Sequence, residues 1–367
     1  MKPNFFAAGA LRPRIVRFAY PFLSLLLIFL LLSLLGIALF LGWSHNRHPD
    51  FPAEKALFQG ESLPLISDTF RVMCWNIGYG GLGAEMDFFF DGGDKVRTSF
   101  GQQQENEDGI TALLKAMEAT DFFLLQEVDS SARRSWGRNQ KEWLASLYPH
   151  YHSSFAVNYA AAFVPLPLYE PMGAVTSGLM SLCRYQPSAS IRYALPGRYA
   201  WPKRLFSLQR CLLLMRFPLA GGKELVLINV HNEAFDAGGM HRKAQLNFLR
   251  QLVLSEYAEG NYVIAGGDWN QNPPEWEAGM LQNGDRGEPI LPPLDASGLE
   301  DWQWAFDASL PTNRFLDQAY QQGNTSTTLI DFFLLSPNIQ LLEVQTFDLS
   351  FLHSDHHPVG VKVVMQP

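Results

Sequence analysis

The sequence predicts an α/β sandwich with helices on its outside, following one transmembrane helix near the N-terminus. Short runs of apolar, β-branched and aromatic residues recur from residue 69 to the end of the chain, which is typical of strands. Between some of these runs, apolar residues stand at helical spacing. Residues 21–43 form one long uncharged apolar stretch, enough to cross a bilayer core of ~30 Å as a helix.

This apolar stretch, PFLSLLLIFLLLSLLGIALFLGW, has two alternative interpretations. A buried core helix of this length and apolarity would be unusual. A cleaved signal peptide is the closer alternative, but its apolar region normally has ~7–15 residues and ends in small residues at a cleavage site. Here the run is longer and continues into LGWSHNRH. We therefore expect an uncleaved anchor.

The flanking charges predict the orientation of the anchor. The basic residues before it are Lys2, Arg12, Arg14 and Arg17, without any acidic residue. The charges after it are balanced: Arg47, Asp50, Glu54 and Lys55. The positive-inside bias predicts a single-pass cell-membrane protein with residues 1–20 as a cytoplasmic leader. Residues 44–68 would form a linker and residues 69–367 one domain, both outside the cytoplasm.

Composition narrows the classes of partner. The formal net charge is -8, so a strongly basic footprint for nucleic acid is absent, although a metal-dependent nuclease stays open. The three cysteines, Cys74, Cys183 and Cys211, lie in apolar stretches and form no C-x-x-C pair. We expect small core residues there, with one disulfide as the alternative.

The predicted elements follow in chain order. Strands are expected at 70–77, 121–128, 178–185, 211–217, 224–231, 261–270, 328–336 and 357–365. Helices are expected at 105–120 and 239–260. Residues 150–210 are apolar, rich in proline and loops, and give no clear assignment. Strands this apolar must be covered on both faces or pack sheet against sheet, which indicates the sandwich.

Polar residues that could take part in catalysis or metal binding lie at the ends of several predicted strands. Glu127 closes the run DFFLLQEV, and a carboxylate there costs several kcal/mol unless it is paired or binds a metal. Asp268 and Asn270 follow another run two positions apart, on one face of an extended segment. Asp331 is expected in mid-strand among apolar residues, where it needs a buried partner.

Further polar residues mark other strand ends: Asn76, His231, Asp355 and His356. Each alone is more often a turn residue or a satisfied polar group. Together they predict oxygen-rich ligation of Mg²⁺, Mn²⁺ or Ca²⁺ rather than of zinc. Convergent Asp and His around such an ion indicate attack by activated water on a phosphoester.

Several short motifs, taken in their order along the chain, together resemble those of a known protein superfamily. These are W-N-I (75–77), L-Q-E (125–127), S-G-L (177–179), N-V-H (229–231), G-D-W-N (267–270), I-D-F-F (330–333) and S-D-H (354–356). In their order and placement the chain resembles the endonuclease/exonuclease/phosphatase, or deoxyribonuclease I-like, superfamily, as a membrane-anchored bacterial-type member. The superfamily includes AP endonucleases, neutral sphingomyelinases and inositol polyphosphate 5-phosphatases. The resemblance implies a four-layer α/β sandwich of two packed mixed sheets flanked by helices.

The resemblance also implies a metal site. Glu127 would be the main ligand of Mg²⁺ (or Mn²⁺ or Ca²⁺), and Asn76 and Asp355 would complete or support the site. The stretch 234–249 is similar to a family loop and helix with an R-x-x-Q pattern, here Arg242 and Gln245.

Catalytic roles are implied in the same way. Asp268 would orient or deprotonate the attacking water, and Asn270 would hold the phosphate. His231 would contact the phosphate or protonate the leaving oxygen. His356 would touch the scissile phosphate while Asp331 fixes its ring. Direct attack by water is likewise implied by the resemblance alone.

The sequence leaves two alternative interpretations open for several segments. The insert 78–109 carries Phe88–Phe90, which either line a substrate mouth or cap the core. Its acidic residues, Glu85, Asp87, Asp91 and Asp94, either add a metal ligand or are solvated. Residues 155–171 form either a membrane-dipping hairpin or ordinary packing.

Basic residues cluster at Arg198, Lys203, Arg204 and Arg210. We assign substrate binding to Arg210 and Arg242, and we regard His353 and His357 as bystanders. The expected activity is hydrolysis of a phosphoester, with a phospholipid or related headgroup favoured over nucleic acid as substrate. The alternatives are an extracytoplasmic nuclease and a non-catalytic binding module of the same fold.

Overall fold

The computed structural model describes residues 13–366 except for residues 66, 235, 237, 275, 278–290 and 292, and residues 13–20 by their backbone alone. It divides into two compact units, Met1–His48 and Pro49–Pro367, each of which we describe by itself.

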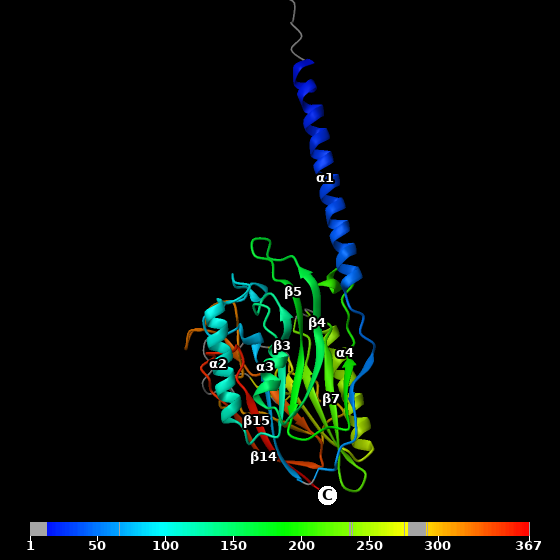
Figure 1. The fold of residues 1–367 in the computed structure, drawn as a ribbon, viewed down its shortest axis with the longest axis vertical. Coiled ribbons are helices and arrows are strands. Elements are labelled where there is room, and N and C mark those ends of the chain that lie inside the picture. The colour runs from blue at the N-terminus through cyan, green and yellow to red at the C-terminus, as the bar shows by residue number, and fades with distance from the viewer. Residues whose placement is uncertain are drawn as a thin grey trace, which may run out of the picture. The chain divides into compact units, whose positions relative to one another are not determined.

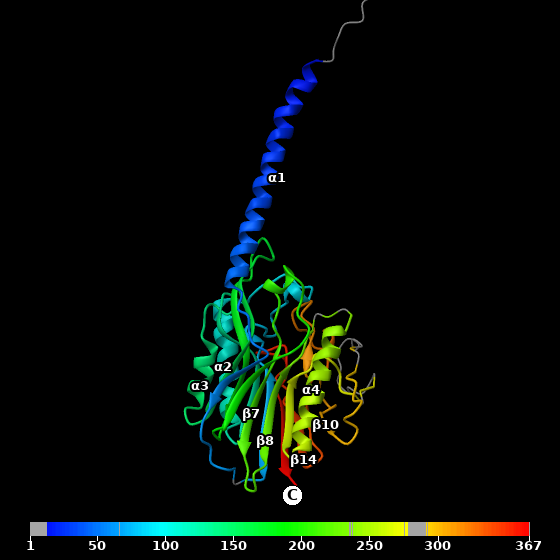
Figure 2. The same cartoon turned by 90° about the vertical axis from the view of Figure 1, so that its right-hand side faces the viewer.

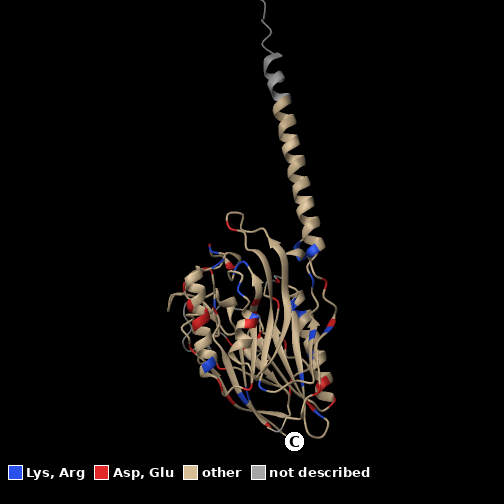
Figure 3. Cartoon of the chain, viewed as in Figure 1, with Lys and Arg blue, Asp and Glu red and all other residues tan. Residues whose placement is uncertain are grey.

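The described residues of the first unit form one helix, α1 (Pro13–Arg47). From Pro21 onward this helix is long and apolar enough to cross a membrane, which suits a single-pass anchor or a signal sequence. Figure 3 shows no acidic or basic residue along the described part of α1 before its last turn. The helix extends beyond the apolar stretch, whose expected end is residue 43, and includes the polar residues 44–47.

The described residues of the second unit form two large sheets and one small one (Figure 1). The seven-stranded sheet consists of β1 (Glu54–Gln59), β6 (Ala189–Ala194), β7 (Cys211–Pro218), β8 (Glu224–His231), β9 (Tyr262–Asp268), β13 (Asp331–Leu335) and β10 (Gln303–Ala305), in that spatial order. The six-stranded sheet consists of β14 (Ile339–Thr346), β15 (Val359–Met365), β2 (Thr69–Asn76), β3 (Phe122–Ala132), β5 (Gly173–Cys183) and β4 (His152–Val164). The short pair is β11 (Asn313–Arg314) and β12 (Thr327–Thr328). Both large sheets are mixed, since β8 and β9 are parallel, as are β2 and β3, among antiparallel neighbours.

The two large sheets pack face to face over one apolar core. Val72 and Leu124 from the six-stranded sheet meet Leu227 and Ile264 from the seven-stranded sheet, and all four are buried. Burial of such side chains contributes about 1.5–3 kcal/mol each relative to exposure. This packing explains why the strands read as continuous apolar runs rather than alternating ones.

Helices cover the outer faces of both sheets, as Figure 2 shows. Helix α4 (Met240–Ala258) packs Leu249 and Val253 on the seven-stranded sheet. Helices α2 (Phe100–Ala116) and α3 (Gln140–Leu147) cover the six-stranded sheet with Ile110 and Leu144, among others. Single 3₁₀ turns lie at η1 (Gly78–Gly80), η2 (Phe89–Asp91) and η3 (Lys203–Leu205). The expected four-layer α/β sandwich is therefore confirmed.

Caps define the starts of two of these helices. The Ser99 side chain accepts a hydrogen bond from the backbone N–H of Gln102 at the start of α2. Asn139 does the same for Glu142 in α3. Such caps satisfy backbone donors that have no partner within the helix.

A buried amide pair connects the two sheets below the site. Gln126 Nε2 donates to Asn229 Oδ1 at 2.7 Å, and Asn229 Nδ2 donates to the carbonyl oxygens of Leu125 and Met180 at 3.1 Å. These bonds explain why L-Q-E and N-V-H each carry an amide inside an apolar run: both amides would be costly if unpaired.

The strands that the sequence did not predict are mostly edge strands. Residues 54–59, expected within the linker 44–68, form β1 and pair antiparallel with β6. β4 and β14 are edge strands of the six-stranded sheet. Strands at an edge pair on one side only and tolerate polar or small residues, so β1 and β14 lack the continuous apolar runs on which the predictions rested, whereas β4 lies in the apolar stretch that was left unassigned.

Candidate active site

Strand register brings three predicted residues side by side. Asp268, the last residue of β9, pairs with His231 at the end of β8 on one side and with Asp331 of β13 on the other. Asp331 opens its strand and does not lie in mid-strand as expected, because the polypeptide enters the sheet only after Ile330. Asn76 ends β2 in the facing sheet, and His356 lies just before β15, the neighbour of β2.

The local backbone around Asp268 is specialised. Gly267 has φ 143°, and a side chain there would overlap the carbonyl oxygen of Val230, so the close approach of β8 and β9 requires glycine. Asn270 has φ 54° and follows the strand's end. The strand ends at Asp268, so the segment is not extended as far as Asn270, but both residues line the same cavity.

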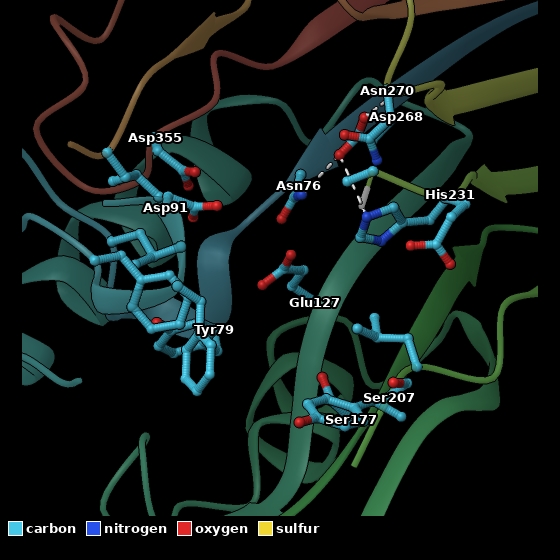
Figure 4. A pocket seen from close by; sticks show the side chains of 18 of the residues that line it. Asn76, Tyr79, Asp91, Glu127, Ser177, Ser207, His231, Asp268, Asn270 and Asp355 are labelled. Atoms are coloured by element: carbon cyan, nitrogen blue, oxygen red, sulfur yellow. Dashed lines mark hydrogen bonds and ion pairs between the residues drawn. The ribbon is translucent and has the colours of Figure 1, made fainter. Parts of the chain in front are cut away.

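Asp268 is the centre of a hydrogen-bonded network (Figure 4). Its Oδ2 accepts a bond from Asn76 Nδ2 at 3.0 Å and lies 3.4 Å from His231 Nε2 and 3.8 Å from His356 Nε2. Its Oδ1 accepts the backbone N–H of Asn270 at 2.9 Å. Burial raises the pKa of Asp268 to about 6, with His356 opposing the rise and Asp331 adding to it.

His231 and His356 differ in charge although they face the same carboxylate. Burial, Arg210 and His356 hold the pKa of His231 well below its usual value, so this ring is neutral at pH 7. Burial would also lower the pKa of His356, but Asp331, Asp355 and Asp268 outweigh it and raise the pKa to about 10. His356 is therefore a cation at neutral pH.

His356 is held from several directions. Its Nδ1 lies 2.8 Å from Asp331 Oδ2, and its carbonyl oxygen accepts a bond from Trp75 Nε1 at 2.9 Å. Ser354 Oγ donates to the carbonyl oxygen of Asn76 at 2.8 Å, which fastens the S-D-H loop to the end of β2. The ring is thus oriented by both sheets.

Glu127 lies on a β-bulge rather than at the close of its strand. The register between β3 and β5 shifts between Leu125 and Val128, and Glu127 has φ 54°, a strained value for a residue with a side chain. β3 then continues to Ala132. The bulge turns the Glu127 side chain toward the cavity, where it is 24% exposed.

The carboxylates fit a divalent cation. Figure 4 shows Glu127, Asp355 and Asn76 around one space. Burial raises the pKa of Asp355 to about 6, a rise that His356 opposes and Glu127 increases. Two hard carboxylates that repel each other in one cavity suit an oxygen-preferring ion such as Mg²⁺. The Oδ1 of Asn76 accepts the N–H of Gly78 at 3.0 Å, which suits the supporting role for this residue.

A second group of ligand-type atoms lies close by. Single ligand atoms of Asp268, Asp331 and His356 lie within 4.8 Å of one another. In this group the 2.8 Å bond between His356 and Asp331 already occupies one atom of each residue. We therefore interpret it as acid–base and electrostatic machinery and the Glu127–Asp355 pair as the metal position.

One cavity of about 730 Å³, a size typical of ligand sites, is lined by the predicted residues Asn76, Glu127, His231, Asp268, Asn270, Asp355 and His356, but not by Asp331. The predicted substrate-binding residues Arg210 and Arg242 line it too.

The two arginines differ in how they are paired. Arg210 is buried, and its Nε lies 4.0 Å from Glu233 Oε2. Neither the Nε nor the Nη1 of Arg210 has a hydrogen-bond acceptor among the described residues. A buried guanidinium so poorly paired favours an anionic ligand. Arg242 Nη2 donates to the carbonyl oxygen of Asp236 at 2.9 Å.

Much of the cavity wall is apolar. The apolar lining comes from the insert, from the β4–β5 hairpin and from the loop before β7, and includes Leu82, Phe88, Phe90, Val164, Met172 and Leu208. Phe88 therefore lines the cavity and also belongs to a buried cluster, so both interpretations of the insert hold in part.

Sequence reasoning missed several residues of the site. Arg134 binds Asp129 through Nε and Nη2 at 3.1 and 3.0 Å, lies 4.0 Å from Glu127, and stacks over the ring of Tyr79. Asn313 contributes an amide nitrogen 3.0 Å from His356 Nε2. Neither follows an apolar run, and the only signal of the buried pair in the sequence is Asp129, two residues after Glu127.

Asp91, which the sequence left between solvation and ligation, lines the cavity beside Asp355 (Figure 4). Asp91 as a whole residue is exposed, but desolvation of its carboxylate on the cavity wall, with Asp355 and Glu127 nearby, raises its pKa to about 7. His357 lies outside the cavity, stacked on Phe351 with ring centroids 3.9 Å apart.

The sheets and this cluster define a class of α/β-sandwich proteins that hold Asp, His and Asn at strand ends in one cavity. The sequence model of the Endonuclease/Exonuclease/phosphatase family matches residues 73–356, and the chain belongs to this family. Members are typically metal-dependent hydrolases of phosphoester bonds.

Solved structures share the fold at low identity. An endonuclease/exonuclease/phosphatase from Beutenbergia cavernae DSM 12333 is 18% identical with a TM-score of 0.55, over 82% of this chain and 72% of that one. The human Nocturnin catalytic domain with bound sulfate anion is 17% identical with a TM-score of 0.52, over 83% and 97%. An endonuclease/exonuclease/phosphatase from Bacteroides vulgatus is 16% identical with a TM-score of 0.51, over 81% and 99%. A search of curated proteins found no match.

Proposed function

We propose that this protein is a divalent-metal-dependent phosphoester hydrolase. The observation that carries the proposal is the convergence of Asn76, His231 and His356 on the carboxylate of Asp268, in a cavity that also holds Glu127. A structural site would not need one neutral and one cationic histidine against the same buried carboxylate.

The charge of each residue determines its role in hydrolysis. Asp268, when ionised, accepts the proton of the attacking water. The cationic ring of His356, oriented by Asp331, meets the negative charge that grows on the phosphate oxygens. Arg210, which also lines the cavity, binds the same anionic group, and Asn270 keeps one amide N–H available after bonding Asn232. A divalent cation at Glu127 and Asp355 would polarise the phosphate when bound.

We further propose a phospholipid or related headgroup as the substrate. The apolar walls of the cavity suit a substrate with an apolar part next to its phosphate. The N-terminal helix suits anchoring in the bilayer that supplies such a substrate. The acidic net charge of -8 disfavours a polyanionic nucleic acid.

The activity is tested with the full chain in phospholipid nanodiscs. Turnover of a choline phospholipid, an inositol phosphate and plasmid DNA is measured with Mg²⁺, with Mn²⁺ and with EDTA. We expect metal-dependent release of a lipid headgroup. Turnover of DNA alone would contradict the lipid substrate, and no turnover together with no Mn²⁺ binding by calorimetry would favour the binding module.

The orientation across the membrane is tested in intact cells. Because Cys74, Cys183 and Cys211 are all buried, a cysteine placed at the exposed Leu342 supplies one reactive thiol. We expect a membrane-impermeant maleimide to label it in intact cells. Labelling only after permeabilisation would place the domain in the cytoplasm.

A further inference from the structure

The connection between β4 and β5 exposes a group of large apolar side chains. In the segment PLPLYEPM (165–172), Leu166 is 47% exposed, Leu168 83% and Tyr169 69%. Single exposed leucines are normal on protein surfaces, but three such residues within four positions form a patch. We call residues 165–172 the β4–β5 tip. In Figure 1 the hairpin projects beyond the ends of its strands.

The β4–β5 tip is braced by the insert rather than folded onto the core. Tyr169 Oη donates to the carbonyl oxygen of Asp94 at 2.7 Å, and the rings of Tyr169 and Phe89 lie 6.2 Å apart. The one acidic group of the tip, Glu170, is paired with Arg97 at 3.1 Å. The exposed leucines are therefore held outward, and the charge beside them is compensated.

The tip is continuous with the mouth of the catalytic cavity. Val164, Pro165, Leu166 and Met172 line the cavity, so the same short segment forms part of its wall and its outer rim. A surface that covered the tip would also face the cavity mouth.

The chain enters the catalytic unit at another wall of this cavity. Asp50 Oδ1 accepts a bond from Arg198 Nη1 at 2.9 Å, and the carbonyl oxygen of Pro49 accepts one from Gln209 at 3.4 Å. The loop between these two partners supplies lining residues such as Lys203 and Leu208. Only His48 separates the end of α1 from Pro49 in the sequence. The apolar helix is therefore joined by a short connection to the segment that bonds this loop.

We propose that the β4–β5 tip docks on the lipid bilayer that anchors α1 and delivers phospholipid to the cavity. Leucine and tyrosine suit the boundary between headgroups and acyl chains, where an apolar body and a hydroxyl are both accommodated. The proposal rests on the proposed lipid-headgroup hydrolase for its delivery step, but the docking itself does not require catalysis.

Docking is tested by fluorescence on the full chain in nanodiscs. Leu168→Cys carries an environment-sensitive dye, and the nanodiscs contain lipids with a doxyl quencher near the top of the acyl chain. The matched control is Leu342→Cys, also exposed (47%) and on β14, the opposite edge of the sheet from β4. We expect strong quenching at position 168 and none at 342. Equal quenching at both positions, or shielding at 168 without quenching as a protein partner would produce, overturns the docking.

Delivery is tested by activity. Leu168→Glu should lower kcat/KM for phospholipid in nanodiscs about tenfold, because it removes apolar contact and adds a charge at the interface. It should leave hydrolysis of the soluble substrate bis(p-nitrophenyl) phosphate unchanged, as should Leu342→Glu for both substrates. Unchanged lipid turnover in Leu168→Glu overturns the delivery role. If the wild type cleaves no phosphoester, the proposed function fails while the quenching still decides the docking.

Discussion

The Nδ1 atom of His356 lies 2.8 Å from Oδ2 of Asp331, and the two residues come from different sheets. Asp331 opens β13 of the seven-stranded sheet, whereas His356 precedes β15 of the six-stranded one. The other oxygen of Asp331 has no hydrogen-bond partner among the described residues. The pair therefore couples the ring's charge and orientation to the way the sheets pack.

Loss of this pair should remove catalysis and spare the fold. We expect Asp331→Asn and His356→Gln to lower kcat by about 100- to 10,000-fold, the usual contribution of a positioned acid–base group. The control is Asp348→Asn, which removes the exposed partner of His357 at 3.6 Å outside the cavity. Steady-state kinetics with thermal unfolding checks this. Near wild-type kcat in Asp331→Asn would show that the ring needs no carboxylate.

Metal binding should depend on Glu127 and not on Asp331. Glu127→Gln keeps the size of the side chain but removes half of the carboxylate pair, so Mn²⁺ affinity should fall by about 100-fold or more. Asp331→Asn should bind Mn²⁺ nearly as wild type does. Calorimetry on both variants distinguishes the two positions: the reverse order of affinities would place the ion at the Asp268, Asp331 and His356 group.

Activity should show an acid limb near pH 6. The pKa of Asp268 is raised to about 6, so this carboxylate is ionised above that pH and protonated below it. Because only the ionised form accepts a proton from water, kcat/KM should fall about tenfold per pH unit below 6 and level off above it. The measurement is a pH profile at saturating Mn²⁺ between pH 4.5 and 8. A flat profile over this range would exclude Asp268 as the proton acceptor.

Arg210 should act on substrate affinity more than on turnover. Arg210→Gln removes a buried cation from the cavity wall, so KM for any phosphoester should rise about tenfold or more. The control Arg198→Gln removes an exposed arginine that pairs with Asp50 and does not line the cavity. Kinetics at constant ionic strength checks this. An equal rise of KM in both variants would point to a general charge effect instead.

Much of the site was predictable because its residues end apolar strands. Asn76, His231 and Asp268 each close a run that the sequence shows directly, and the structure has each as the last residue of its strand. Glu127 was found for the same reason, but its bulge was not, since a single left-handed residue leaves no mark on apolar periodicity. Arg134 and Asn313 were missed because neither lies in a periodic segment.

By itself the sequence determined the apolar N-terminal helix, the order of the main strands, the family motifs and the carboxylate and histidine types in the site. These are local properties, readable from the burial that each segment requires. Only the tertiary structure decided which side chains meet. Strand register placed Asp268 between His231 and Asp331, and sheet packing brought Asn76 and His356 to the same carboxylate. Such contacts join residues nearly 300 positions apart, as in the bond between Trp75 and His356 with a separation of 281, and periodicity along the chain carries no record of them.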